Sequence, residues 1–316
     1  MTSRRSSTRG TKPQRTKRPT TARETPPERT ALLVEAKKLR AKKRFSQNFL
    51  IDESVIQKIV SALHLQCGDT IVEIGPGAGF LTQALVKDPA QVVGIELENS
   101  MCRYLKGKFK TADNFTLYEQ DVLKFSFDEI KPKKFKIVGN LPYNITSPIL
   151  FYLVGEIHQA EHALRKRAQQ ITLMVQKEVA ERITAEPGTK GYNHLSIAVQ
   201  FWCEARYEFT VPPNAFYPRP KVESAVITLT PREAPLCKVE DPEFFARFIQ
   251  GVFRYRRKTL KNALQQSGFL AGFAAEDISG TILESLGIAP QARAETLSIQ
   301  QFVELAHAVR QHTRQG

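Results

Sequence analysis

The sequence predicts an α/β protein in which a mostly parallel sheet is followed by a small, all-helical domain. Three observations support this: short apolar runs alternate with helical patterns, a glycine-rich loop follows the first run, and the β-rich runs end at Pro231. The 316 residues, of which 41% are hydrophobic, suffice for two globular units and a tail. We therefore expect a disordered basic arm over residues 1–40, an α/β domain over residues 41–231 and a helical domain over residues 232–316.

The N-terminal arm is expected to be disordered because it is rich in Arg, Ser, Thr and Pro and has little apolar surface to bury. Residues 1–40 contain twelve Lys and Arg against three Glu, so they hold +9 of the formal net charge of +14. A basic surface favours polyanionic partners, either nucleic acid or anionic lipid. A transit peptide, which is also rich in Arg and Ser, is the alternative for this segment.

Cysteine usage and hydropathy indicate the compartment. Cys67, Cys102, Cys203 and Cys237 lie far apart, with no C-x-x-C pair and no signal-peptide pattern. We therefore expect a reducing cytoplasm, and neither a disulfide framework nor a thiolate zinc site. No run of about 18 uncharged apolar residues is present, so no membrane-spanning helix is expected. A monomer without a bound metal is the default expectation.

The parallel part of the sheet follows from the order of the elements. Runs of strand length are separated by single segments of helical spacing, which predicts parallel strands joined by right-handed crossovers. In chain order the expected elements are a helix over residues 53–63, a strand over 70–74, a helix over 80–86, a strand over 91–96, a helix over 101–109, and strands over 115–120 and 135–140.

The later β-rich runs predict antiparallel strands. Residues 171–176, 204–211 and 224–230 are β-rich, and a Pro-rich loop separates the last two runs. Beyond Pro231 only helical spacing remains, which predicts a separate helical domain. Its expected helices cover residues 241–253, 258–266, 277–287 and 298–311.

The segment "VEIGPGAGF" places Gly75, Gly77 and Gly79 between a strand and a helix, where glycines let the backbone approach a nucleotide-type ligand. A dinucleotide fingerprint would need glycine at position 80, where Phe80 stands, so nicotinamide or flavin binding is disfavoured.

Two carboxylates follow the next strands. Glu96 ends its strand about 20 residues beyond the glycines, where a carboxylate accepts both ribose hydroxyls. Asp121 follows the strand after that and could accept a hydrogen bond from an adenine amine. Either residue alone could be a solvated charge at a strand end. Together they outline a nucleoside pocket.

The turn Asn140-Leu141-Pro142-Tyr143 ends the strand over residues 135–140, on the same edge of the sheet. If the pocket holds S-adenosylmethionine, this turn lies beside the methyl group. The Asn140 amide oxygen and the Leu141 carbonyl could accept the two N–H bonds of an exocyclic base amine, and Tyr143 could stack on the base. The alternative is an ordinary helix N-terminus with Asn as cap, Pro in the turn and Tyr in the core.

The motifs "RFSQNFLID", "VEIGPGAGFLT", "VVGIELE", "QDVLKF", "GNLPYNITSPIL", "PPNAFYPRPKVESAVITL" and "FRYRRKTLKNAL" resemble, in order and spacing, those of the ribosomal RNA adenine dimethyltransferase family. The resemblance runs from about Arg44 to the C-terminus. It implies a Rossmann-like, S-adenosylmethionine-dependent methyltransferase whose partner is the small ribosomal subunit or its precursor. The implied reaction is N6,N6-dimethylation of two adjacent adenosines near the 3′ end of small-subunit rRNA.

The resemblance also implies roles for individual residues. Phe216 is expected to face Tyr143 across the target base, which leaves its stack to react. Ser46 and Asn193 stand where the family pattern favours glycine, which puts the local loop conformation in doubt. The implied cofactor contacts are Asn48, Leu50, Gly75, Glu96, Asp121 and Asn140.

Two rival functions share this scaffold. One is the large-subunit rRNA methyltransferase of the macrolide-resistance type; the "NLPY" wording and the extended helical C-terminus favour the small-subunit branch instead. The other is a non-catalytic assembly or transcription factor, which is expected to lose Glu96, Asp121 or Asn140, and all three are present.

The segment "FRYRRKTLKNAL" predicts an RNA contact. Its helical spacing places Arg254, Arg257, Lys258 and Lys261 close to one face, where they suit phosphate contacts that position RNA without reading its sequence. A solvated helix face is the alternative, but clustering with Arg256 favours RNA.

The pattern "HQAEH" from His158 to His162 has the spacing of a zinc motif. It lies at the end of a helical pattern, in a polar stretch with no third ligand near it. We therefore interpret it as a solvated loop.

Overall fold

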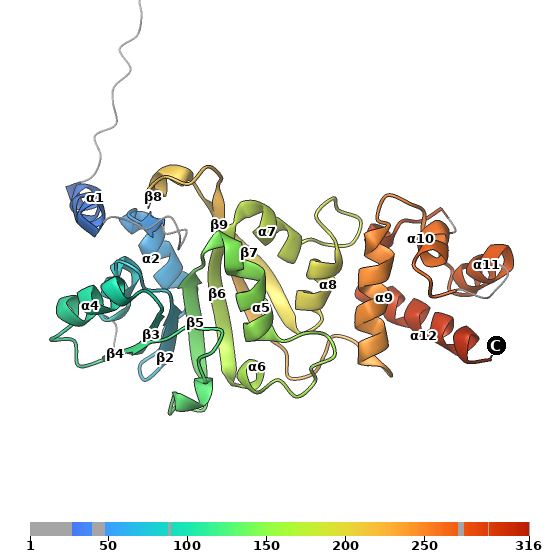
Figure 1. Cartoon of the computed structure of the whole chain (residues 1–316), viewed down its shortest axis with the longest axis horizontal. Helices are drawn as coiled ribbons and strands as arrows, with labels where there is room; N and C mark the ends of the chain where they lie inside the picture. The colour runs from blue at the N-terminus through green and yellow to red at the C-terminus, as the bar shows by residue number, and fades with distance from the viewer. Residues whose placement is uncertain (1–26, 40–47, 88–89, 271–274, 290, 316) are drawn as a thin grey trace, which may run out of the picture.

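The structure, a computed structural model, describes residues 27–39, 48–87, 90–270, 275–289 and 291–315. Its centre is a seven-stranded sheet with the order β4-β3-β2-β5-β6-β9-β7, and the C-terminal helices gather at one end (Figure 1). The neighbours from β4 to β6 are parallel, and β9 runs antiparallel to β6 and β7, which confirms the predicted α/β fold. The strands are β2 (Thr70–Ile74), β3 (Gln91–Glu96), β4 (Phe115–Glu119), β5 (Phe135–Asn140), β6 (Ala168–Gln176), β7 (Cys203–Val211) and β9 (Ser224–Pro231).

A second, two-stranded sheet pairs β1 (Phe49–Leu50) with β8 (Phe216–Tyr217) in antiparallel orientation. The helices that accompany both sheets are α1 (Pro27–Leu39), α2 (Glu53–Ala62), α3 (Phe80–Leu85), α4 (Asn99–Lys108), α5 (Thr146–Val154), α6 (Ala163–Arg167), α7 (Lys177–Ile183) and α8 (His194–Gln200).

The strand order reverses next to β2, which lies between β3 and β5. The chain moves outward from β2 to β4 and then returns to the other side of β2 with β5. In open α/β sheets such a reversal opens a crevice beyond the carboxyl ends of the two strands, and ligands bind there. Lys136 on β5 holds this arrangement from the opposite end, since its buried ammonium pairs with Asp69 at 2.8 Å and donates to the carbonyls of Leu63 and His64.

The C-terminal helices are α9 (Pro242–Arg254), α10 (Leu260–Gln266), α11 (Ala275–Ser285) and α12 (Ile299–Gln315), as the helical spacing predicts. Helix α9 begins with Asp241 as N-cap and Pro242 in its first turn, and it buries one strongly apolar face. That face belongs to one apolar cluster that continues into the sheet, so the helices pack on the α/β part.

The expected disorder of residues 1–40 is wrong for residues 27–39, which form helix α1. Composition favoured disorder, but Ala36 is fully buried and joins an apolar cluster with Phe49, Phe80 and Phe216. Tertiary packing therefore supplies the burial that the segment lacks by itself. Residues 1–26 lie outside the described residues.

Asn193, one of the two departures from the family pattern, caps helix α8. Its side chain accepts a hydrogen bond from the Leu195 amide at 2.8 Å, and the Asn193 backbone amide donates one to the Ser196 hydroxyl at 3.0 Å. Asparagine is therefore a stabilising residue at this position. Ser46, the other departure, lies outside the described residues. No helix in the described part of the chain is long and apolar enough to cross a membrane.

Candidate active site

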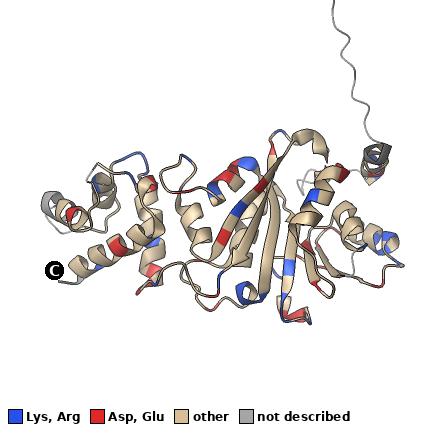
Figure 2. Cartoon of the chain, turned by 180° about the vertical axis from the view of Figure 1, so that it is seen from behind, with Lys and Arg blue, Asp and Glu red and all other residues tan. Residues whose placement is uncertain are grey.

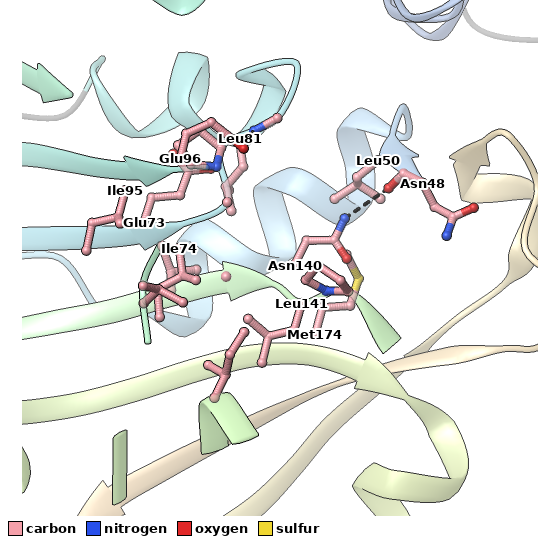
Figure 3. A pocket seen from close by; sticks show the side chains of 18 of the residues that line it. Asn48, Leu50, Glu73, Ile74, Leu81, Ile95, Glu96, Asn140, Leu141 and Met174 are labelled. Carbon is pink, nitrogen blue, oxygen red and sulfur yellow. Dashed lines mark hydrogen bonds between the residues drawn. The ribbon is translucent and has the colours of Figure 1, made fainter. Parts of the chain in front are cut away.

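A cavity of about 300 Å³ opens at the carboxyl ends of β2, β3 and β5, where the strand order reverses. Figure 3 shows side chains from these strands and from the β1 segment pointing into it. The structure thus brings together eight of the residues predicted for the cofactor or the base. They are Asn48, Leu50, Gly75, Glu96, Asp121, Asn140, Leu141 and Tyr143.

The glycine loop forms one wall of the cavity. Gly75, Gly77 and Gly79 have φ values of +67°, +56° and +69°, in the left-handed region that favours glycine. A Cβ atom on Gly79 would also lie 2.7 Å from the Leu105 side chain. Gly75 and Gly77 line the cavity, and the loop has a conformation that other residues would adopt only with strain.

Glu96 anchors this loop. Its carboxylate accepts hydrogen bonds from the Gly77 and Glu98 amides, each at 2.9 Å. Burial raises the pKa of Glu96 above its ordinary value, and the two backbone donors oppose that rise. Each carboxylate oxygen keeps a further lone pair, so Glu96 can still accept hydrogen bonds from a ligand in the cavity.

Glu73 is a cavity residue that sequence reasoning missed. It lies on β2, is 2% exposed and accepts a hydrogen bond from the Thr82 hydroxyl at 2.6 Å. Burial raises its pKa to about 7. The signal was present in the sequence, because a lone glutamate interrupts the apolar run over residues 70–74, and a buried carboxylate needs an explanation.

Asn140 lies at the end of β5 and faces the segment that precedes β1. Its side-chain nitrogen donates to the Asn48 carbonyl at 3.1 Å, which orients the amide and leaves its oxygen as an acceptor (Figure 3). The Leu141 amide donates to the Met174 carbonyl at 3.1 Å, so the turn is also held on β6. Pro142 then begins a short 3-10 turn. These bonds hold a hydrogen-bond acceptor at the rim of the cavity.

Asp121 follows β4 and lines the cavity. One of its carboxylate oxygens accepts a hydrogen bond from the Leu123 amide at 3.0 Å. The neighbouring Gln120 amide donates to the Glu96 carbonyl at 2.9 Å, which ties this turn to β3. The two acidic residues predicted for a nucleoside thus share one wall.

The two aromatic residues predicted to hold a base differ in position. Tyr143 lines the cavity, and its hydroxyl lies 2.7 Å from the Ser224 hydroxyl. Burial raises the pKa of Tyr143. Phe216 is 3% exposed, pairs with Leu50 across the β1–β8 ladder and packs in the apolar cluster rather than against the cavity. In this conformation the Tyr143 and Phe216 rings therefore do not face each other across a space that could hold a base.

The expected single helical face from Arg254 to Lys261 is wrong, because a turn separates α9 from α10. The Thr259 side chain accepts from the Asn262 amide and starts a new helix. Figure 2 shows the turn as a run of basic residues. Arg254, Arg257 and Lys258 are exposed and Lys261 is half-buried, so these four cations remain grouped near the turn.

Arg256 differs from its neighbours because it is engaged within the protein. Its guanidinium pairs with Glu295 at 2.7 Å and also donates to the Lys190 carbonyl. The Gly188 amide donates to the Glu295 carbonyl at 2.7 Å. These bonds join the loop before α8 to the C-terminal helices, so Arg256 orients the basic turn.

His162 of the set-aside "HQAEH" pattern caps α6, since its Nδ1 accepts a hydrogen bond from the Arg165 amide at 3.1 Å. Among the described residues no group of three or more His, Cys, Asp and Glu is arranged to hold a metal ion.

Known proteins are similar to this chain over most of its length. A relative named ribosomal RNA small subunit methyltransferase A, from Coxiella burnetii, is 40% identical over 274 residues, which cover 86% of this chain and 98% of the relative. A protein of the same name from Moorella thermoacetica is 39% identical over 293 residues, 90% of this chain and 97% of its own length.

Solved structures agree on the fold. A dimethyladenosine transferase from Plasmodium falciparum superposes with a TM-score of 0.67 at 25% identity, over 83% of this chain and 97% of that one. The 23S rRNA methyltransferase ErmE reaches 0.64 at 24% identity, over 83% of this chain and all of the other, which shows a common fold. The model of the family described as ribosomal RNA adenine dimethylase matches residues 38–311. The chain therefore belongs to the ribosomal RNA adenine dimethylase family.

Proposed function

We propose that this protein transfers methyl groups from S-adenosylmethionine to the N6 amines of two adjacent adenosines near the 3′ end of small-subunit rRNA. The observation that carries the proposal is the Asn140 amide, whose nitrogen is engaged by the Asn48 carbonyl while its oxygen remains an acceptor beside the cavity. The small-subunit relatives, similar over nearly their whole length, support the choice of substrate.

The cavity residues fit S-adenosylmethionine. The left-handed glycines allow a ligand to approach the loop backbone closely. Glu96 is fixed by two backbone amides and is suited to accept the ribose hydroxyls, and Asp121 is suited to accept the adenine amine. Leu50 and Leu81 add apolar surface to the same cavity. When bound there, S-adenosylmethionine would supply an electrophilic methyl group for in-line displacement by an amine, with the thioether S-adenosylhomocysteine as leaving group and one amine proton lost to water at each transfer.

The turn after β5 would prepare the target amine. The exocyclic nitrogen of adenine is a poor nucleophile because its lone pair is delocalised into the ring. The Asn140 amide oxygen and the Leu141 carbonyl would accept its two N–H bonds and favour a pyramidal nitrogen with an available lone pair. The Tyr143 ring would stack on the base, and Phe216 would close the other side once it leaves its packed position. These residues contribute positioning and a preorganised polar site.

The basic elements would bind the rRNA backbone. Arg254, Arg257, Lys258 and Lys261 lie together near the α9–α10 turn and suit phosphate contacts. Residues 1–26 add eight Lys and Arg against one Glu, or +7, and would contribute affinity that depends on salt. We further infer a monomer that acts on the small subunit in the cytoplasm, in keeping with four free cysteines.

A methyl-transfer assay with labelled S-adenosylmethionine tests the function. Isolated small and large ribosomal subunits are the two substrates, and the labelled nucleotides are identified after digestion. We expect N6,N6-dimethyladenosine at two adjacent positions of small-subunit rRNA. Label in large-subunit rRNA alone would assign the macrolide-resistance activity, and no transfer to either subunit would leave a non-catalytic factor.

A further inference from the structure

Helix α1 is connected to the wall of the cavity through the side chains of α4. The Glu35 carboxylate accepts a hydrogen bond from the Lys108 ammonium at 2.9 Å and another from the Tyr104 hydroxyl. Lys108 is 15% exposed and Glu35 is 32% exposed at the side chain, so the pair is partly shielded from water. Ala36, the next residue of α1, is fully buried and keeps the helix in place.

Lys108 also contacts the glycine loop. Its ammonium donates to the Ala78 carbonyl at 3.2 Å and lies 4.7 Å from the centre of the Phe80 ring. The rings of Tyr104 and Phe109 lie 5.7 Å away, so the ammonium has aromatic neighbours on several sides. A cation in such surroundings needs an anionic partner, and among the described residues Glu35 is the carboxylate that pairs with it.

The carbonyl that Lys108 holds lies at the centre of the loop. Ala78 stands between Gly77, whose amide donates to Glu96, and Gly79, which precedes α3. The charge of Lys108 also reaches Glu73 on the cavity wall, where it favours the ionised carboxylate and opposes the effect of burial. Lys108 therefore acts on two parts of the cavity while it lies outside the lining.

We propose that Lys108, held by Glu35, is a positioning residue for the cofactor, and that helix α1 is thereby part of the cofactor site. The inference rests on the proposed use of S-adenosylmethionine. Without the pair, the Ala78 carbonyl loses its donor and the left-handed loop loses one of its constraints. The loop then has to be ordered by the ligand, which lowers affinity without changing the reacting groups.

Calorimetry of the full-length protein with S-adenosylmethionine tests the proposal. We expect Glu35→Gln to raise the dissociation constant about five-fold, since it removes a partly exposed charge pair, and Lys108→Met to raise it about ten-fold or more. Lys108→Arg keeps the charge and should remain close to wild type. The matched control is Lys106→Ala on the same helix, whose ion pair is with Glu119 and is exposed.

A second readout separates positioning from general stability. Turnover on small subunits at saturating S-adenosylmethionine should stay within about two-fold of wild type for Glu35→Gln, while the Michaelis constant for the cofactor rises. Wild-type affinity in both Glu35→Gln and Lys108→Met would overturn the proposal, whether or not their melting temperatures fall. Weaker cofactor binding in these variants together with an inactive wild type on small subunits would support it and refute the proposed function instead.

Discussion

The buried carboxylate of Glu73 predicts in which direction the free energy of unfolding changes with pH. Its pKa is raised from 4.5 to about 7 because the side chain is fully buried on β2, with the Thr82 hydroxyl as a hydrogen-bond donor. Glu73 therefore keeps its proton up to about pH 7 in the folded protein, whereas in the unfolded chain it releases the proton near pH 4.5. The stability that this group contributes is fully present below about pH 4.5 and is lost as the pH rises through about 7.

The size of the effect follows from the shift. A rise in the pKa of Glu73 from 4.5 to about 7 corresponds to about 3 kcal/mol, since a pKa change of one is about 1.36 kcal/mol. Glu73→Gln keeps an oxygen that accepts from Thr82 but cannot acquire a charge. Relative to wild type, the variant should therefore gain about 2 to 3 kcal/mol in free energy of unfolding between about pH 5 and about pH 8.5.

Urea denaturation of the ligand-free proteins, followed by circular dichroism at both pH values, measures this difference. Subtracting the wild-type value removes the contribution of every other titrating group. Glu233→Gln, which changes an exposed carboxylate, is the control and should show no such gain. If the free energy of unfolding of Glu73→Gln relative to wild type were the same at both pH values, burial would not raise the pKa of Glu73, and the prediction would be refuted.

Four further substitutions test the site and the basic turn. Asn140→Ala should lower turnover on small subunits by about two orders of magnitude, because one polar contact to the reacting amine is lost, while calorimetry shows that much of the cofactor affinity remains. Turnover within a few-fold of wild type would refute this role. Glu96→Ala should instead raise the dissociation constant of S-adenosylmethionine by at least ten-fold, at about 1.5 to 3 kcal/mol for each charge-assisted hydrogen bond, and unchanged calorimetric affinity would remove Glu96 from the site. Arg257→Ala should reduce the slope of log affinity for rRNA against log salt by about one, whereas Arg256→Ala should mainly lower the melting temperature, because its guanidinium is bound to Glu295; the opposite pattern would show that the two roles are exchanged.

The strand ends of the site could be predicted from the sequence because the carboxyl ends of parallel strands meet at one edge. Gly75, Glu96 and Asn140 lie at the carboxyl ends of three different strands, and the structure places all three around one cavity. The role of Asn48 could be predicted only from the family resemblance. No local sequence pattern indicates that its backbone carbonyl will orient an amide side chain 92 residues away.

Other features depend on tertiary contacts, which the spacing of apolar and charged residues along the sequence does not reveal. The bond between Glu35 and Lys108 joins residues 73 apart in the chain, and it accompanies a helix whose composition favours disorder. The cations from Arg254 to Lys261 were expected on one helical face because their positions fit a 3.6-residue repeat. Thr259 as an N-cap was the local signal against a single face.

The ladder between β1 and β8 links the two ligands of the proposed reaction. Leu50, which we propose contacts the cofactor, pairs directly with Phe216, which in the proposed reaction would leave its packed position to meet a base. A conformational change at one strand therefore alters the other. Linkage then requires that RNA and cofactor change each other's affinity by the same factor, so the enzyme would sense in one site whether the other is filled. Titrating each ligand in the presence and in the absence of the other would measure that common factor.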